Sequence, residues 1–150
     1  MSTESDLREK LATCTRIFTM QQLIGMFGHV SVYQPDTQRI LICPGAGPDK
    51  PNTRPEDVLV LNLEGNVLEG TEWLPVEWPI HTTLHAARAD AIAVAHLHAP
   101  YATLFAIARR EFRPVTLSGS KFGEGVPLYP DTRMVLTPQR GRQLLSLIHI

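Results

Sequence analysis

Residues 77–98 hold the side chains whose types and spacing could do chemistry, and the most telling are His96 and His98. The apolar run before them predicts a β-strand over residues 91–98, along which side chains alternate between two faces. The two imidazoles therefore share one face and can bind a single metal ion. Pro100 ends the strand directly after them.

Glu77 precedes a predicted helix over residues 77–89. A carboxylate in that place could move a proton to or from a substrate beside a metal ion, or it could simply cap the helix, where the macrodipole favours negative charge. His81 and His85 follow on the same helix face. They lack the glutamate of a zincin motif, so we expect them to line the pocket or support the ligands.

Other interpretations of the histidine pair stay open at this point, including plain hydrogen-bonded residues at a strand end. Cupins and metallo-hydrolases also begin with His-x-His, but residues 99–102 add none of the acids or histidines that these sites need. Residues 28–31 and 44–47 sit at predicted strand ends, where they could be simple turns or could offer backbone N–H groups to an anion. Residues 118–121 lack the spacing of a phosphate loop.

The composition narrows the class of protein. The chain has 150 residues, a net charge of -1 and no basic face that would indicate nucleic-acid binding. Cys14 and Cys43 form no CxxC pair, which favours reduced thiols and a cytoplasmic location. The N-terminus is polar, and the apolar stretch 91–108 is interrupted by histidines and a proline, so neither a signal peptide nor a membrane span is expected.

The order of elements predicts an α/β domain. Asp6 is the expected N-cap of a first helix. The other expected elements are hairpins over 29–43 and 58–68, helices over 77–89, 100–110 and 139–150, and strands over 91–98, 115–117 and 134–136. Several strands followed by alternating helices and strands favour a mixed sheet covered on both faces.

Four stretches of the chain, in the order in which they occur, resemble the class II aldolase/adducin family. They are residues 28–32 (GHVSV), 40–45 (ILICPG), 77–81 (EWPIH) and 95–103 (AHLHAPYAT), within a resemblance that runs from about residue 7 to about residue 143. The resemblance implies a three-layer α/β/α sandwich with a central mixed, largely antiparallel sheet. It also implies a homotetramer that acts on small molecules at subunit interfaces, with no nucleic-acid or membrane partner.

The same resemblance implies roles for particular residues. The family's enzymes make or break carbon–carbon bonds while a divalent metal, Zn²⁺ or sometimes Mn²⁺, stabilises an enolate. By position, His96 and His98 would be metal ligands and Glu77 the acid–base residue. The implied substrate-binding residues are Gly28, His29, Ser31, Pro44 and Gly45.

The family's third histidine ligand lies in an Asn-His-Gly-like segment well past the His-x-His pair, and His149 lacks its flanking residues. We therefore expect residues 1–150 to be a single domain that is incomplete at its C-terminal end, with the third ligand beyond it. The uncapped apolar run 144–150 also suggests a fragment, whose last residues need not be native.

The chain departs from the sugar-phosphate aldolases of this family. They carry asparagine in place of His29 and a pair of serines in place of Pro75 and Val76, and Leu117 stands near their product-protonating tyrosine. The loss of hydroxyl donors favours an unphosphorylated or aromatic hydroxy acid as substrate, cleaved by retro-aldol chemistry or decarboxylation. A sugar-phosphate aldolase or epimerase, and a non-catalytic scaffold like the adducin heads, are the alternatives; the adducins have lost the metal histidines.

Overall fold

The computed structural model describes residues 3–45, 49–70, 73–123 and 125–147. Its centre is one sheet with the strand order β4-β3-β2-β1-β5. The strands are β1 (His29–Gln34), β2 (Arg39–Ile42), β3 (Leu59–Leu61), β4 (Val67–Glu69) and β5 (Ala93–His96). Every pairing within this sheet is antiparallel, and both predicted hairpins form.

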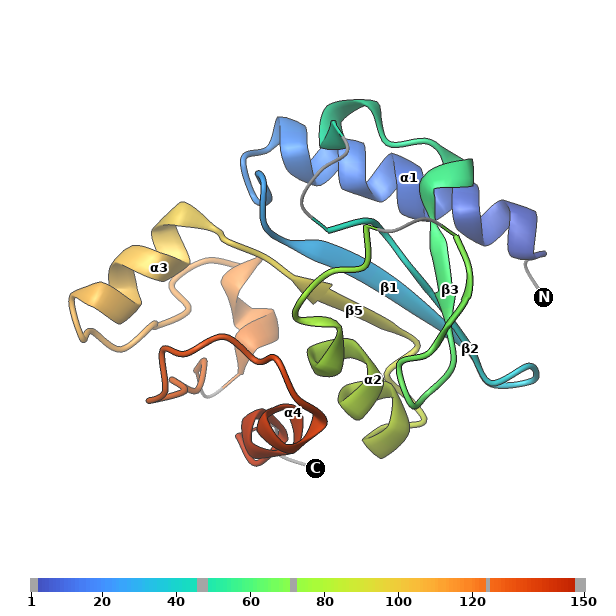
Figure 1. Cartoon of the computed structure of the whole chain (residues 1–150). Helices are drawn as coiled ribbons and strands as arrows, with labels where there is room; N and C mark the ends of the chain where they lie inside the picture. The colour runs from blue at the N-terminus through green and yellow to red at the C-terminus, as the bar shows by residue number, and fades with distance from the viewer. Residues whose placement is uncertain (1–2, 46–48, 71–72, 124, 148–150) are drawn as a thin grey trace.

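Helices cover both faces of the sheet (Figure 1). The four α-helices are α1 (Glu4–Met20), α2 (Trp78–Ala87), α3 (Pro100–Ile107) and α4 (Pro138–Leu145). One face packs on α1; the other carries α2, with α4 beside it, while α3 extends past the end of β5. Short 3₁₀ turns complete the elements at Lys50–Asn52, Pro55–Asp57 and Gly119–Phe122. The three-layer α/β/α arrangement with a largely antiparallel central sheet, expected from the sequence, is confirmed.

The two faces bury different side chains because neighbours along a strand point to opposite sides. Toward α1 lies an apolar cluster of Leu11, Val30, Leu41, Cys43, Val58 and Val60. On the opposite face, Tyr33, Ile40, Ile42, Leu59 and Leu61 form a second apolar cluster, packed against Trp78 at the start of α2. Beside this second cluster, the α2 face becomes polar along β1 and β5. Val30 faces α1, whereas His29 and Ser31 face α2.

The register of β1 and β5 creates this polar region. His29 pairs with His96, and Ser31 pairs with Val94. Directly opposed residues of an antiparallel pair share a face and place their side chains close together. Two histidines that are 67 positions apart in the chain therefore lie side by side.

Three local predictions were wrong. The first helix is capped by Thr3, whose hydroxyl accepts from the Asp6 N–H while Asp6 accepts from the Thr3 N–H, so Asp6 belongs to the capping box without being the cap. Residues 115–117 and 134–136 are not strands, because these short apolar runs have no strand partner in the described chain. The helix expected over 139–150 spans Pro138–Leu145, and residues 148–150 lie outside the described part.

No helix among the described residues is both long enough and apolar enough to cross a bilayer.

Candidate functional site

The N-terminal end of α2 brings polar side chains to the sheet. Pro79 fits the first turn, where its missing N–H costs nothing. His81 and His85 follow on the face that meets the sheet, with 0% and 2% of their surface exposed. The helix thus places two imidazoles directly over β1.

A continuous line of hydrogen bonds joins these histidines to β1. His85 Nδ1 lies 2.8 Å from the Ala91 carbonyl oxygen, and its Nε2 lies 2.8 Å from Ser31 Oγ. Ser31 Oγ lies 2.6 Å from His81 Nδ1. His81 Nε2 lies 2.6 Å from His29 Nδ1, and His29 Nε2 lies 3.4 Å from His96 Nδ1. The line runs from a backbone carbonyl to the first member of the His-x-His pair.

Burial keeps these imidazoles neutral. Desolvation is the largest cause in each case: it lowers the pKa of His29 to about 3, the pKa of His81 well below its usual value, and the pKa of His85. Neighbouring histidines lower the pKa of His29 and of His81 further. A neutral imidazole has one N–H donor and one lone-pair acceptor, so each ring can continue the line in one direction only.

Glu77 does not cap its own helix. Although it occupies the N-cap position of α2, its side chain makes no capping bond. Instead, Oε1 accepts a 2.8 Å hydrogen bond from the backbone N–H of Val135, and Oε2 lies 3.7 Å from His96 Nδ1. With 14% of the side chain exposed, the carboxylate faces the histidines. The Glu77 side chain therefore does not cap α2 by a hydrogen bond, and its acid–base role stays a prediction.

The histidine pair straddles the end of β5. His96 is the last strand residue, and burial lowers its pKa while Glu77 opposes that effect. His98 lies two residues further on and is exposed; its backbone N–H donates to the Leu23 carbonyl at 2.7 Å. The ring centroids of His96 and His98 are 4.9 Å apart, so the pair stays together although the strand is shorter than predicted.

The described residues contain no group of three or more histidine, cysteine, aspartate or glutamate side chains arranged to hold a metal ion. His96 and His98 fit a divalent metal in kind, since neutral imidazole is a common ligand. In number they supply two of the three protein ligands that a catalytic zinc site needs.

A cavity of about 300 Å³ opens next to Glu77 and His29. Its remaining wall is mostly apolar and consists of Met26, Phe27, Gly45, Trp73, Leu74, Pro75 and Val76. Gly45 permits the close approach of two loops here, because a Cβ on it would lie 2.8 Å from Pro75 Cα. The cavity thus combines two polar groups at one end with an apolar body.

The expected substrate-binding residues are only partly at this cavity. His29 and Gly45 line it, whereas Gly28, Ser31 and Pro44 are not among its lining residues. Ser31 is fully buried, and its hydroxyl is committed to two imidazoles. Gly28 has a φ of +96°, and a Cβ there would clash with Ile24, so this glycine serves the turn that leads into β1.

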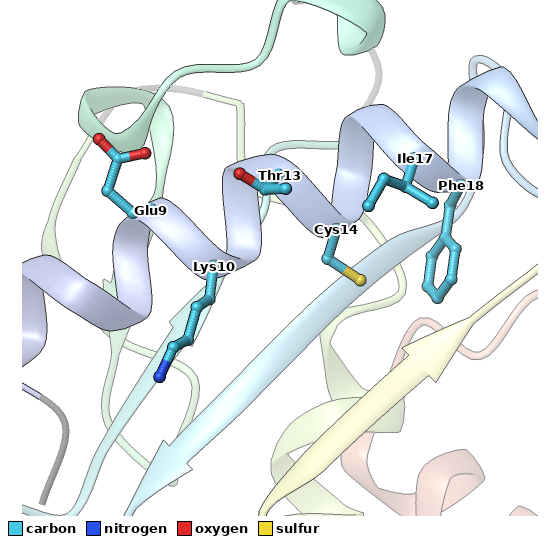
Figure 2. Close-up of a pocket in the computed structure, with 6 residues that line it drawn as sticks. All are labelled: Glu9, Lys10, Thr13, Cys14, Ile17 and Phe18. Carbon is cyan, nitrogen blue, oxygen red and sulfur yellow. The ribbon is translucent and has the colours of Figure 1, made fainter.

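A second hollow lies on the other side of the sheet, along α1 (Figure 2). It is an open groove of about 370 Å³, and all of its lining residues come from that one helix: Glu9, Lys10, Thr13, Cys14, Ile17 and Phe18. It contains none of the histidines. The cavity beside Glu77 is therefore the candidate site.

Sequence reasoning missed several parts of this site. It did not connect His81 and His85 through Ser31, although a serine two places from His29 on β1 shares that residue's face. The backbone N–H of Val135 carries no signal in the sequence. Trp73 and Phe27 lie in predicted loops, so nothing marked them as cavity walls.

Comparisons with known proteins identify the family of the chain. A model of the class II aldolase and adducin N-terminal domain matches residues 9–146. A 3,4-dihydroxyphthalate decarboxylase of Arthrobacter keyseri is 29% identical over 157 residues, covering 95% of this chain and 62% of the relative. A 5-deoxy-D-ribulose 1-phosphate aldolase of Bacillus thuringiensis is 35% identical over 82 residues, covering 55% of the chain and 38% of the relative.

Among solved structures, an L-fuculose 1-phosphate aldolase superposes with a TM-score of 0.74 at 26% identity, covering 95% of this chain and 69% of that protein. The chain spans less than two thirds of the length of both curated relatives.

Proposed function

Because the chain belongs to the class II aldolase and adducin family, we propose that it forms part of a lyase that decarboxylates an aromatic hydroxy acid. One observation carries this choice among the family's reactions: the wall of the cavity next to Glu77 is apolar, with Phe27 and Trp73 on it. Burying an aromatic ring against such a wall is favourable, whereas a phosphate needs charged or hydrogen-bonding partners.

The charges around the cavity support the same choice. No lysine or arginine is among the residues that line it in the described part of the chain. Lys50 is buried but does not line the cavity, and its ammonium group donates a hydrogen bond to the Gly28 carbonyl. Pro75 and Val76 stand in the wall where hydroxyl donors would be needed to hold a phosphate.

His96 and His98 are the proposed metal ligands, and a third ligand comes from outside the described residues. Zn²⁺ suits two imidazoles, and Mn²⁺ is the alternative. When bound, the ion supplies a Lewis acid that stabilises negative charge developing on a substrate oxygen. The active protein is proposed to be a cytoplasmic homotetramer; Cys14 and Cys43 are both free thiols, as a reducing compartment requires.

The residues of this chain then orient the substrate and handle its proton. The apolar wall holds the ring. Cleavage of the bond between the ring and its carboxylate releases CO₂ and leaves the electron pair on the ring carbon. Glu77 delivers a proton to that carbon from Oε2, because Oε1 is occupied by the Val135 N–H. Water returns the proton to Glu77 for the next cycle.

The test compares two substrates on the Zn²⁺- or Mn²⁺-loaded full-length protein, in which the third metal ligand is present. We expect CO₂ release from 3,4-dihydroxyphthalate and no cleavage of L-fuculose 1-phosphate. The variant Val76→Ser, which returns a hydroxyl to the wall, should lower the first activity, while Val67→Ser, a matched exposed position on β4, should not. Cleavage of the sugar phosphate alone would overturn the proposal in favour of an aldolase. Turnover of neither substrate by metal-loaded protein would favour a scaffold.

A further inference from the structure

The hydrogen-bond line through Ser31 has a direction, and its last member is a proposed metal ligand. A carbonyl oxygen can only accept, so His85 must carry its proton on Nδ1, which lies 2.8 Å from the Ala91 carbonyl oxygen. In the neutral ring this leaves a lone pair on His85 Nε2. The Ser31 hydroxyl therefore donates to His85 and keeps its own lone pairs for the next partner.

The same reasoning passes along the line one residue at a time. Ser31 Oγ accepts from His81, so His81 is protonated on Nδ1 and has its lone pair on Nε2. His29 Nδ1 must donate to that lone pair, which leaves His29 Nε2 as an acceptor. No carboxylate contacts Ser31, His81 or His85 among the described hydrogen bonds and ion pairs. No negative charge there would stabilise the protonated, positively charged form of His81 or His85.

The line ends at His96. Its Nδ1 faces the acceptor His29 Nε2 at 3.4 Å and the Glu77 carboxylate at 3.7 Å. Of these two acceptors, only His29 Nε2 lies within hydrogen-bonding distance, so it holds the proton of the neutral His96 ring on Nδ1. Nε2 is then the nitrogen that carries the lone pair.

We propose that Ser31, His85, His81 and His29 form a one-way hydrogen-bond chain that fixes the tautomer of His96 and leaves its Nε2 free to bind a metal ion. This deepens the proposed function and rests on His96 being a ligand. Ser31 acts as a positioning residue. Its hydroxyl joins two histidines, because it donates its proton to His85 and accepts a hydrogen bond from His81. Partners of this kind orient a ligand histidine and raise its affinity for metal.

Nitrogen NMR of the histidine side chains in the metal-free chain tests the direction. We expect His29, His81, His85 and His96 all to carry the proton on Nδ1, although free neutral histidine prefers Nε2. On titration with Zn²⁺, the Nε2 resonance of His96 should move while Nδ1 stays protonated. A metal-free His96 protonated on Nε2, or a zinc-bound His96 that uses Nδ1, would overturn the proposal. Neither readout depends on which substrate the protein turns over.

Two variants locate the cause. Ser31→Ala removes only a hydroxyl, so His81 Nδ1–H loses its acceptor; the tautomers of His81, His29 and His96 should become mixed, and Zn²⁺ binding should weaken on the order of 10-fold or more. Thr15→Val is the matched control, because it removes a buried hydroxyl from the α1 side, where Thr15 donates to the Leu11 carbonyl.

Thr15→Val should change neither the tautomers nor zinc affinity. Should Ser31→Ala fail to fold, His85→Phe offers a second route, since it removes the anchor at the Ala91 carbonyl and leaves Ser31 in place. Unchanged tautomers in a folded Ser31→Ala or His85→Phe protein would contradict the proposal.

Discussion

The two faces of the sheet are built on different principles. Toward α1, buried side chains such as Leu11, Leu41 and Val60 are all apolar. They stabilise the fold because their surface is removed from water, and this requires no specific partner atom. Toward α2, the region of His29, Ser31 and His81 is equally buried but polar, so each atom needs a specific partner. One face of the same five strands supplies stability, and part of the other supplies a site.

The contrast shows how a small domain can hold a buried polar site. The apolar half of the α2 face, around Ile40, Ile42 and Leu61, lies beside the polar half and packs on Trp78. A fully satisfied polar network specifies one arrangement, whereas a partly satisfied one is costly. We therefore expect changes on the α1 face to alter stability and changes on the polar half of the α2 face to alter chemistry.

The largest effect should come from Glu77→Gln. The amide oxygen can still accept from the Val135 N–H, so the fold should persist, while the proton donor is lost. Turnover of the metal-loaded protein should fall on the order of 10²-fold or more, a typical general acid–base contribution. Steady-state kinetics measure it, with the exposed Glu64→Gln as control. Unaltered turnover would remove Glu77 from the proposed mechanism.

Leu41→Ala examines the opposite face. Leu41 is fully buried against α1, so truncation leaves a cavity and should lower the free energy of unfolding by about 2–5 kcal/mol. Denaturant titration gives this value. The histidine tautomers of the folded protein should stay as they are; if they changed together with stability, the two faces would not be independent.

Gly141→Ala tests how the packing of α4 on α2 supports the polar half of the α2 face. A Cβ on Gly141 would lie 2.4 Å from Thr83 Oγ1 and 2.8 Å from the Pro79 carbonyl oxygen, so α4 must move away from α2. We expect a loss of about 1–3 kcal/mol of stability, as for other overpacked sites. Because Val135 precedes α4, turnover should fall as well. Wild-type stability in thermal unfolding would show that the two helices separate at no cost.

Between pH 7 and pH 5, acid should act mainly on the buried histidines of the α2 face. The pKa of His29 is lowered to about 3 in the fold, so below its ordinary pKa of 6.5 the unfolded chain binds a proton that the folded chain does not. The stability of the fold therefore falls as pH drops from about 6.5 toward 3, by at most about 1.4 kcal/mol per pH unit for each such group.

On the α1 face, burial raises the pKa of Cys43 to about 11, so this thiol stays neutral throughout this range. Unfolding curves at pH 7, 6 and 5 measure the slope. His29→Asn should have a smaller slope than wild type, whereas an identical slope would assign the acid sensitivity to other groups.

The sequence predicted the elements of the site better than their connections. The α2 helix, the β5 strand and both hairpins follow from local periodicity, and Glu77, His96 and His98 were candidates by type and spacing whose roles stay predictions. The contact of His29 with His96 depends on the register of two distant strands, which no local pattern encodes. His81 and His85 were placed on the correct helix face, but their link through Ser31 needs the distance between that helix and the sheet.

The hydrogen bond from Val135 to Glu77 has a consequence for how this site can change during evolution. The donor is a backbone N–H, so any side chain that fits the buried position 135 preserves it, whereas proline removes it. A residue on which the orientation of the carboxylate depends can therefore change to others of similar size and polarity without loss of the hydrogen bond. Sequence conservation would miss this dependence, while a scan of proline substitutions would find it.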